Sequence, residues 1–286
     1  MVKYIEINNV GALNKLKRKI PYGWDLNIYR GCEHGCKYCY AIYSHDYLND
    51  GNFFDNVYYK KDILNQLEKE LSSPSWKREI VNIGGVTDSY QPIEKDLKIM
   101  PEVLKLMIKY KTPVIISTKS DLILRDIDLI DELSKITYVN IAFTVTTMDE
   151  KLRERLEPNA SPSIKRFEAL SKFKNTNASL GIHLMPIIPY LTDSYENLEE
   201  IYRLSSETKV DYVLPGTLYL LGKTKPYFFN FIKEYDIEIY NKIRELYVKG
   251  SASKEYKDGL YKKVNEVKNK YNVSSNYMSI LKSKMK

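Results

Sequence analysis

Cysteine is scarce in this sequence and confined to one place. The 286 residues contain three cysteines, Cys32, Cys36 and Cys39, which fall in a C-x3-C-x2-C pattern. An odd number of cysteines at this spacing cannot form a disulfide framework. Clustered thiols indicate a set of metal ligands instead, for an iron–sulfur cluster or for a structural zinc ion with a histidine as fourth ligand. Free thiols of this kind predict a reducing compartment, so we expect a cytoplasmic protein.

Long apolar runs are also missing. No stretch approaches the ~20 consecutive apolar residues that span a bilayer, and the N-terminus lacks the apolar core of a signal peptide. We therefore expect no membrane partner. Hydrophobic residues make up 43% and charged residues 28%, a balance typical of a globular protein whose length suits one α/β domain. The sequence shows no internal repeat beyond an alternation of strand and helix patterns.

Strand and helix patterns alternate six times between residues 22 and 220. Short apolar segments predict strands over 24–29, 80–85, 113–118, 138–145, 180–185 and 210–214. Helical periodicity predicts helices over 61–71, 101–110, 125–136, 149–156, 162–174 and 193–206. Such units form parallel strands with right-handed crossovers, and six of them favour an open, partial (β/α)6 barrel over a closed one of eight. Functional side chains are then expected at the C-terminal ends of the strands.

The two flanks differ from this middle region. Residues 1–21 are expected to form a loosely structured, basic lead-in. Residues 221–286 are expected to form a helical, basic C-terminal extension, with one helix over 227–247 and a break at 250–253. From 251 to 286 nine lysines oppose three acidic residues. Lysines interleaved with tyrosines indicate nucleic-acid binding, and a solvated lysine-rich helix is the equally weighted alternative.

Four motifs lie at or near the ends of predicted strands and helices. They are Gly84-Gly85-Val86-Thr87-Asp88, Ser117-Thr118-Lys119-Ser120, Leu156-Glu157-Pro158-Asn159 and Met185-Pro186-Ile187. Glycine permits close backbone approach to a ligand, and a lysine at a strand end is placed to neutralise a carboxylate. We expect Glu157 to orient Arg125 or Arg166 structurally. The three histidines, His34, His45 and His183, have no partner that the sequence identifies and are expected to be surface or satisfied core residues.

Together, the cysteine pattern, with Tyr38 at its aromatic position, and these motifs resemble the radical S-adenosylmethionine (SAM) superfamily. Within it they are most similar to the spore photoproduct lyase branch, or DNA repair photolyase-like proteins, over about residues 22–217. The resemblance implies a [4Fe–4S] cluster on the three cysteines, with SAM on the fourth iron. It further implies reductive cleavage of SAM to a 5′-deoxyadenosyl radical that abstracts hydrogen from damaged or modified DNA thymine. A reductase such as flavodoxin or ferredoxin would supply the electron.

The resemblance also implies roles for individual residues around SAM. Tyr38 would line the adenine, Gly84, Gly85 and Asp88 belong to the segment that contacts the methionine amino group, Lys119 would pair with the carboxylate, and Thr144 and Thr146 would lie near the ribose. Each of these residues sits in the cysteine motif or at the end of a predicted strand.

One feature departs from the spore photoproduct lyase pattern. Those enzymes use a further cysteine near the Gly-Gly-x-Thr segment as hydrogen donor, whereas this chain has Val86 there and no fourth cysteine. Tyr90, Tyr40 or Tyr43 would then donate hydrogen from a phenol, or the product radical would recover it from 5′-deoxyadenosine. Two other functions stay open: radical SAM modification of a peptide or small metabolite, and a zinc-stabilised binding module.

Overall fold

Six parallel strands dominate the larger of two β-sheets. The computed structural model describes residues 2–8, 11–17, 22–48, 50 and 52–284. In the larger sheet the strand order is β10-β9-β8-β7-β6-β3-β2, and every pair from β3 to β10 is parallel. Its parallel strands are β3 (Trp24–Leu26), β6 (Val81–Ile83), β7 (Val114–Thr118), β8 (Val139–Thr144), β9 (Ser179–Ile187) and β10 (Tyr212–Thr217). The partial (β/α)6 barrel is thereby confirmed.

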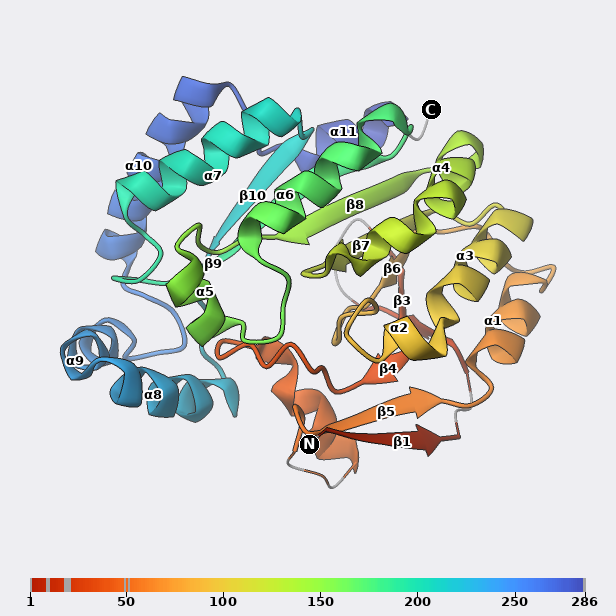
Figure 1. Ribbon diagram of the computed structural model, residues 1–286, viewed down its shortest axis with the longest axis horizontal. Helices are drawn as coiled ribbons and strands as arrows, with labels where there is room; N and C mark the ends of the chain where they lie inside the picture. Colours follow the sequence, from red (N-terminus) through yellow and green to blue (C-terminus); the bar gives the residue numbers. More distant parts are fainter. Residues whose placement is uncertain (1, 9–10, 18–21, 49, 51, 285–286) are drawn as a thin grey trace.

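Helices between the strands cover one side of this sheet, in the same order as the strands (Figure 1). They are α1 (Ile63–Leu71), α2 (Glu94–Leu97), α3 (Ile99–Lys109), α4 (Ile127–Ile136), α5 (Glu150–Leu156), α6 (Ser163–Lys172) and α7 (Tyr195–Thr208). Each long helix buries one apolar stripe; α3, for example, buries Met100, Val103, Leu104 and Met107. All six residues of β8 are buried, as expected for a parallel strand that is covered on both faces.

The N-terminal lead-in is more ordered than predicted. β1 (Lys3–Ile7) pairs in parallel with β5 (Asn56–Lys60), and β2 (Leu13–Lys15) pairs antiparallel with β3. The expectation of a loose lead-in is therefore wrong for these residues, while residues 1, 9–10 and 18–21 lie outside the described part. The predicted strand at 24–29 is also divided, because β4 (Tyr29–Arg30) joins β5 in the smaller sheet. These short strands are stabilised by distant partners, so their local sequence gives little signal.

The C-terminal extension contains four helices. The single helix predicted over 227–247 is instead two, α8 (Thr224–Tyr235) and α9 (Ile237–Leu246). The break falls at Asp236, whose backbone is extended and whose carboxylate accepts the N–H groups of Glu238 and Ile239 at the start of α9. α10 (Lys254–Tyr271) then packs against α7, and α11 (Tyr277–Lys284) against β9. None of the helices in the described ranges is long and apolar enough to cross a membrane.

Two hydrophobic clusters determine where the site lies. The main core is between the sheet and its covering helices. A second cluster joins Cys36 and Tyr38 to Leu156 of α5 and to Phe228 and Ile232 of α8. The segment that carries the cysteines is thus packed between the barrel and the C-terminal extension, where α8 and α9 lie beside α5 in Figure 1.

Candidate active site

A cavity of about 400 Å³ opens at the C-terminal ends of the parallel strands. One wall is the cysteine loop, residues 31–40, which follows β3 and β4. The other walls come from the ends of β6 to β10, in chain order Gly84, Val86, Thr87, Asp88, Ser117, Thr118, Lys119, Thr144, Met185, Pro186, Gly216 and Thr217. Six strand ends therefore converge on one space, as the parallel topology predicts.

All three cysteines line this cavity as free thiols. Cys32 and Cys36 are buried, and Cys39 is partly exposed. Burial raises the pKa of the Cys36 thiol to about 12 despite the opposing charge of nearby Lys119. A bound metal centre would reverse this, because its positive charge favours the thiolate form. The set suits a cluster that takes three thiolates; among the described residues no three His, Cys, Asp or Glu side chains are grouped to hold a single ion.

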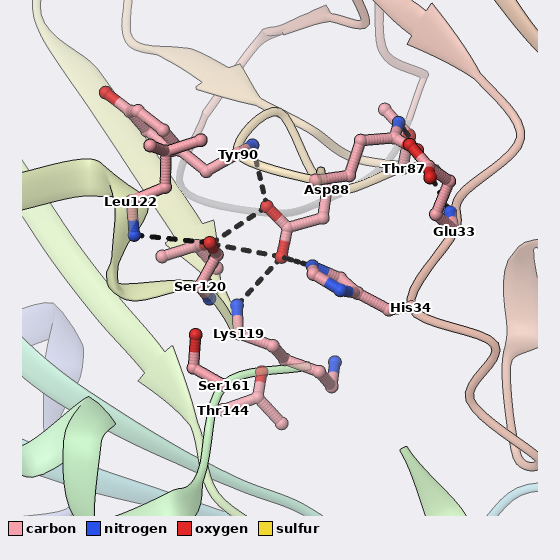
Figure 2. Close-up of polar contacts among 12 residues, drawn as sticks. Glu33, His34, Thr87, Asp88, Tyr90, Lys119, Ser120, Leu122, Thr144 and Ser161 are labelled. Carbon is pink, nitrogen blue, oxygen red and sulfur yellow. Dashed lines mark hydrogen bonds and ion pairs between the residues drawn. The ribbon is translucent and has the colours of Figure 1, made fainter. Parts of the chain in front are cut away.

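The Asp88 carboxylate connects the cysteine loop to the ends of β6 and β7 (Figure 2). It accepts hydrogen bonds from the Lys119 backbone N–H at 2.8 Å, the Tyr90 backbone N–H at 2.9 Å and the Thr118 hydroxyl at 2.8 Å. Nε2 of His34 lies 3.0 Å from its Oδ2 atom. Burial by itself opposes ionisation, but the His34 ring and these donors outweigh it and lower the pKa of Asp88 to about 2.

His34 is the partner that sequence reasoning missed. Its Nε2 faces the Asp88 carboxylate, and its Nδ1 lies 3.1 Å from the carbonyl oxygen of Asn159. Both neighbours accept hydrogen bonds, so each ring nitrogen faces an acceptor atom of the protein. Neither nitrogen is then free for a metal ion. The position of His34 between two cysteines was the one available signal that it belongs to the site.

Gly84 allows a tight turn of the backbone beside the cavity. Its φ is +86°, a conformation that side chains disfavour, and a Cβ there would lie 2.9 Å from the Thr87 carbonyl oxygen. Gly85 is not among the residues that line the cavity, but its carbonyl oxygen accepts the hydroxyl of Tyr40. The double glycine thus places one backbone segment at the cavity and fixes a tyrosine at its edge.

A second buried carboxylate, Glu157, lies on the other side of the cysteine loop. Arg166 donates to it from Nη2 at 2.5 Å, and the Tyr38 hydroxyl also donates to it. Glu157 and Arg166 are fully buried. Burial opposes ionisation of Glu157, but the Arg166 and Lys119 charges outweigh it and lower the pKa of Glu157. The expected Glu157–Arg166 interaction is confirmed, whereas Arg125 instead pairs with Glu94 and Asp126.

Lys119 reaches into the cavity between these two carboxylates. Its Nζ lies 5.8 Å from the centre of the Tyr38 ring and forms no ion pair within the described part of the chain. Thr144 lines the cavity as well, beside Lys119 in Figure 2. Thr146 does not line it: this residue is fully buried and its hydroxyl donates to Glu157 at 3.3 Å. The cavity therefore holds a cation that is available for an anionic ligand group.

The three candidate tyrosines lie in different surroundings. Tyr40 lines the cavity and is 62% exposed, which places it at the mouth. Tyr90 is completely buried in the main core; only its backbone N–H serves the site, by donating to Asp88. Tyr43 is also absent from the cavity lining. Of the three, Tyr40 alone lines the cavity, and its hydroxyl donates to the Gly85 carbonyl oxygen.

Comparison with known proteins assigns the family. The Radical SAM superfamily model matches residues 26–204, which include the cysteine loop and five of the six parallel strand ends. The chain belongs to the radical SAM superfamily. This membership implies a [4Fe–4S] cluster and SAM as cofactors, and it confirms the coarser prediction of a radical SAM enzyme.

Relatives extend over most of this radical SAM chain. An uncharacterized protein of Mycobacterium tuberculosis is 31% identical over 254 residues, covering 87% of this chain and 75% of that protein. An uncharacterized protein of Methanocaldococcus jannaschii is 29% identical over 234 residues, covering 80% and 78% respectively.

Solved structures of spore photoproduct lyase share the fold. One, complexed with dinucleoside spore photoproduct, has a TM-score of 0.69 at 13% identity and covers 94% of this chain and 79% of that one. A mutant with bound AdoMet and dinucleoside spore photoproduct has a TM-score of 0.67 at 14% identity, with the same coverage. The prediction of a radical SAM chain with a fold like that of spore photoproduct lyase is confirmed.

The basic extension of this radical SAM protein is partly neutralised within the molecule. Lys270 pairs with Glu199, Lys284 lies 3.4 Å from Asp211, and Lys263 donates to the Asp193 carbonyl oxygen. Several lysines predicted to track phosphates thus have partners in the barrel, and the surface available to a nucleic acid is smaller than the lysine count indicates.

Proposed function

We propose that this protein binds a [4Fe–4S] cluster on Cys32, Cys36 and Cys39 and uses it to cleave SAM reductively. The observation that carries this proposal is that three free thiols and the Lys119 ammonium, which has no ion pair among the described residues, line one cavity of about 400 Å³. When bound, the cluster would supply an electron to SAM and so generate a 5′-deoxyadenosyl radical that abstracts hydrogen. A reducing cytoplasm with a reductase such as flavodoxin or ferredoxin would fit this chemistry.

The residues around the cavity have separate tasks in this proposal. The Lys119 ammonium would bind the SAM carboxylate through a charge-assisted hydrogen bond. The backbone at Gly84 would leave room for the methionine end, with Asp88 holding that segment in place through its own hydrogen bonds. Tyr38 would provide an apolar wall for the adenine, and Thr144 a hydroxyl near the ribose. Gly85 and Thr146 would act indirectly, through Tyr40 and Glu157.

The proposed substrate is damaged or modified thymine in DNA. Its support is the fold of spore photoproduct lyase, structures of which hold dinucleoside spore photoproduct. The exposed side chains of Tyr40 and Tyr219 line the cavity and would offer flat surfaces to a base. Tyr40 would also return hydrogen to the product radical, since no fourth cysteine is present. The basic extension would contribute phosphate contacts.

Reconstituted protein tests the proposal. Under anaerobic conditions with dithionite and SAM, 5′-deoxyadenosine is measured with UV-irradiated DNA, with undamaged DNA and without DNA. We expect nucleoside to form and damaged DNA to stimulate it, while Cys36→Ala should form none. Equal formation without DNA would place the substrate elsewhere, and no formation from a complete cluster would overturn the radical chemistry. The Tyr40→Phe variant should still cleave SAM. Because it lacks the phenol that would return hydrogen, it should accumulate the product radical or side products formed from it.

A further inference from the structure

Residues 156–159 form the turn at the end of α5. This turn lies along the cysteine loop but does not line the cavity. Its first half holds the two-residue spacer between Cys36 and Cys39. The backbone N–H of Lys37 donates to the Leu156 carbonyl oxygen at 2.9 Å, and the Tyr38 hydroxyl donates to the Glu157 carboxylate. Both spacer residues are therefore fixed by consecutive residues of the turn.

Its second half holds the three-residue spacer between Cys32 and Cys36. Nδ2 of Asn159 donates to the Glu33 carbonyl oxygen at 2.6 Å, and the Asn159 N–H donates to the His34 carbonyl oxygen at 3.3 Å. Gly35 has a φ of +66°, and a Cβ there would lie 3.0 Å from Cγ of Pro158. The proline thus packs directly on bare backbone in the middle of the spacer.

The turn is itself rigidly held. Arg166 donates to Glu157 from Nη2, to the Thr144 carbonyl from Nη1 and to the Ser161 carbonyl from Nε. Nη1 of Arg153 donates to the Glu157 carbonyl at 2.8 Å. Both guanidinium groups are buried. Both arginines belong to barrel helices, so these anchors of the turn need no cofactor.

We propose that residues 156–159 are a template that holds the cysteine loop in its cluster-binding conformation before the cluster is inserted, with Glu157 and Asn159 as positioning residues. Leu156 and Glu157 hold the spacer between Cys36 and Cys39. Pro158 and Asn159 hold the spacer between Cys32 and Cys36, so the two pairs together fix the distances between the three thiols. Because the loop is already ordered before the cluster is inserted, the free energy of cluster binding does not include the cost of ordering the loop. The inference rests on the cluster ligands proposed above.

Hydrogen exchange in the cluster-free protein tests the template. We expect the Lys37 amide to exchange at least ~100-fold more slowly than in an unstructured peptide. Tyr38→Phe and Asn159→Ala should each raise exchange at loop amides ~10-fold. They should also lower the iron and sulfide bound per chain and alter the EPR spectrum of the reduced cluster. Lys151→Gln is the matched control, since Lys151 is an exposed residue on α5, and it should change none of these.

Two results would overturn the template: fast exchange at Lys37 in the unaltered protein, or Tyr38→Phe and Asn159→Ala variants that behave like the control. Should Asn159→Ala fail to fold, Tyr38→Phe decides alone, because it removes a single oxygen and leaves the Glu157–Arg166 pair intact. A protected loop in a chain that takes up no iron would defeat the cluster assignment but not the template. An unprotected loop in a chain that takes up a full cluster would defeat the template alone.

Discussion

Two buried carboxylates lie on either side of the cysteine loop and are stabilised in different ways. Asp88 is held by backbone N–H groups, a hydroxyl and the His34 ring. Glu157 is held by the full charge of the Arg166 guanidinium, together with the Tyr38 hydroxyl. A neutral side chain at Asp88 would leave mainly neutral donors without an acceptor. A neutral side chain at Glu157 would leave a buried cation without a counter-charge, which costs more.

The largest effect should therefore follow Glu157→Gln. Removing one partner of a buried ion pair costs about 3–5 kcal/mol, because the remaining charge stays buried. We expect this loss in the free energy of unfolding of the cluster-free protein, measured by urea denaturation. Lys151→Gln, at an exposed position of α5, should change it by less than about 0.5 kcal/mol. Equal losses of unfolding free energy in the two variants would show that the buried Glu157–Arg166 pair stabilises the fold no more than an exposed side chain of α5.

A double variant sharpens the same point. Replacing Arg166 with methionine in the Glu157→Gln background removes the uncompensated cation. The double variant should thus be more stable than Glu157→Gln alone, as found when buried ion pairs are replaced as a unit. A double variant that is less stable would show that the Arg166 bonds to the Ser161 and Thr144 carbonyls outweigh its charge.

Asp88→Asn should have a smaller effect. The amide keeps one oxygen as acceptor but turns an NH₂ group toward some of the donors that now bind Asp88. We expect a loss of about 1–3 kcal/mol in unfolding free energy, the cost of leaving buried donors unsatisfied. A loss as large as that of Glu157→Gln would mean that the His34 ring acts as a full counter-ion.

Acid should lower the stability that the ionised Asp88 carboxylate contributes to the fold. The pKa of Asp88 falls from an ordinary 3.8 to about 2, because the His34 ring and the surrounding donors outweigh the opposing effect of burial. A lowered carboxylate pKa stabilises the fold above the unfolded value, and this stability is lost as the pH drops from about 4 to about 2. The loss amounts to about 2 kcal/mol and should be absent from the Asp88→Asn variant in a pH series of denaturation curves.

The smallest effect on stability should come from Lys119→Met, although Lys119 binds Asp88 through its backbone and feels the charge of Glu157. Its backbone N–H binds Asp88 and survives the substitution, while its ammonium has no ion pair in the described structure. We expect less than about 1 kcal/mol of lost stability. SAM binding to the reconstituted protein should nevertheless weaken by about 1–3 kcal/mol in calorimetry. Unchanged SAM affinity would remove Lys119 from the proposed site.

The sequence predicts the barrel well because its strands carry their own signal. β8 is a fully buried strand with four apolar residues out of six, and the amphipathic helices between strands alternate with such segments regularly. The parallel topology then brings Lys119, Thr144 and Gly84 to one edge. β1 and β2 lack such a signal, since their order depends on partners elsewhere in the chain.

The contacts between side chains were harder to predict. His34 and Asp88 are 54 residues apart, and nothing local in either segment identifies the pair. Tyr90 is expected in the site as a phenol that could replace the missing cysteine, but its ring lies in the core and only its backbone N–H reaches Asp88. Thr146 follows the end of β8 at Thr144, so the alternation of the strand no longer decides where its side chain points.

The helix that covers the cysteine loop is made late. Thr224, at the start of α8, donates its hydroxyl to the Cys39 carbonyl oxygen, and the two residues are 185 positions apart. During synthesis the three thiols therefore leave the ribosome long before the residue that closes over them. Until that point the Cys39 carbonyl oxygen lacks this donor, and Cys36 and Tyr38 lack the apolar contacts that α8 provides. The cysteine loop therefore completes its packing only after all six strands of the barrel have been made.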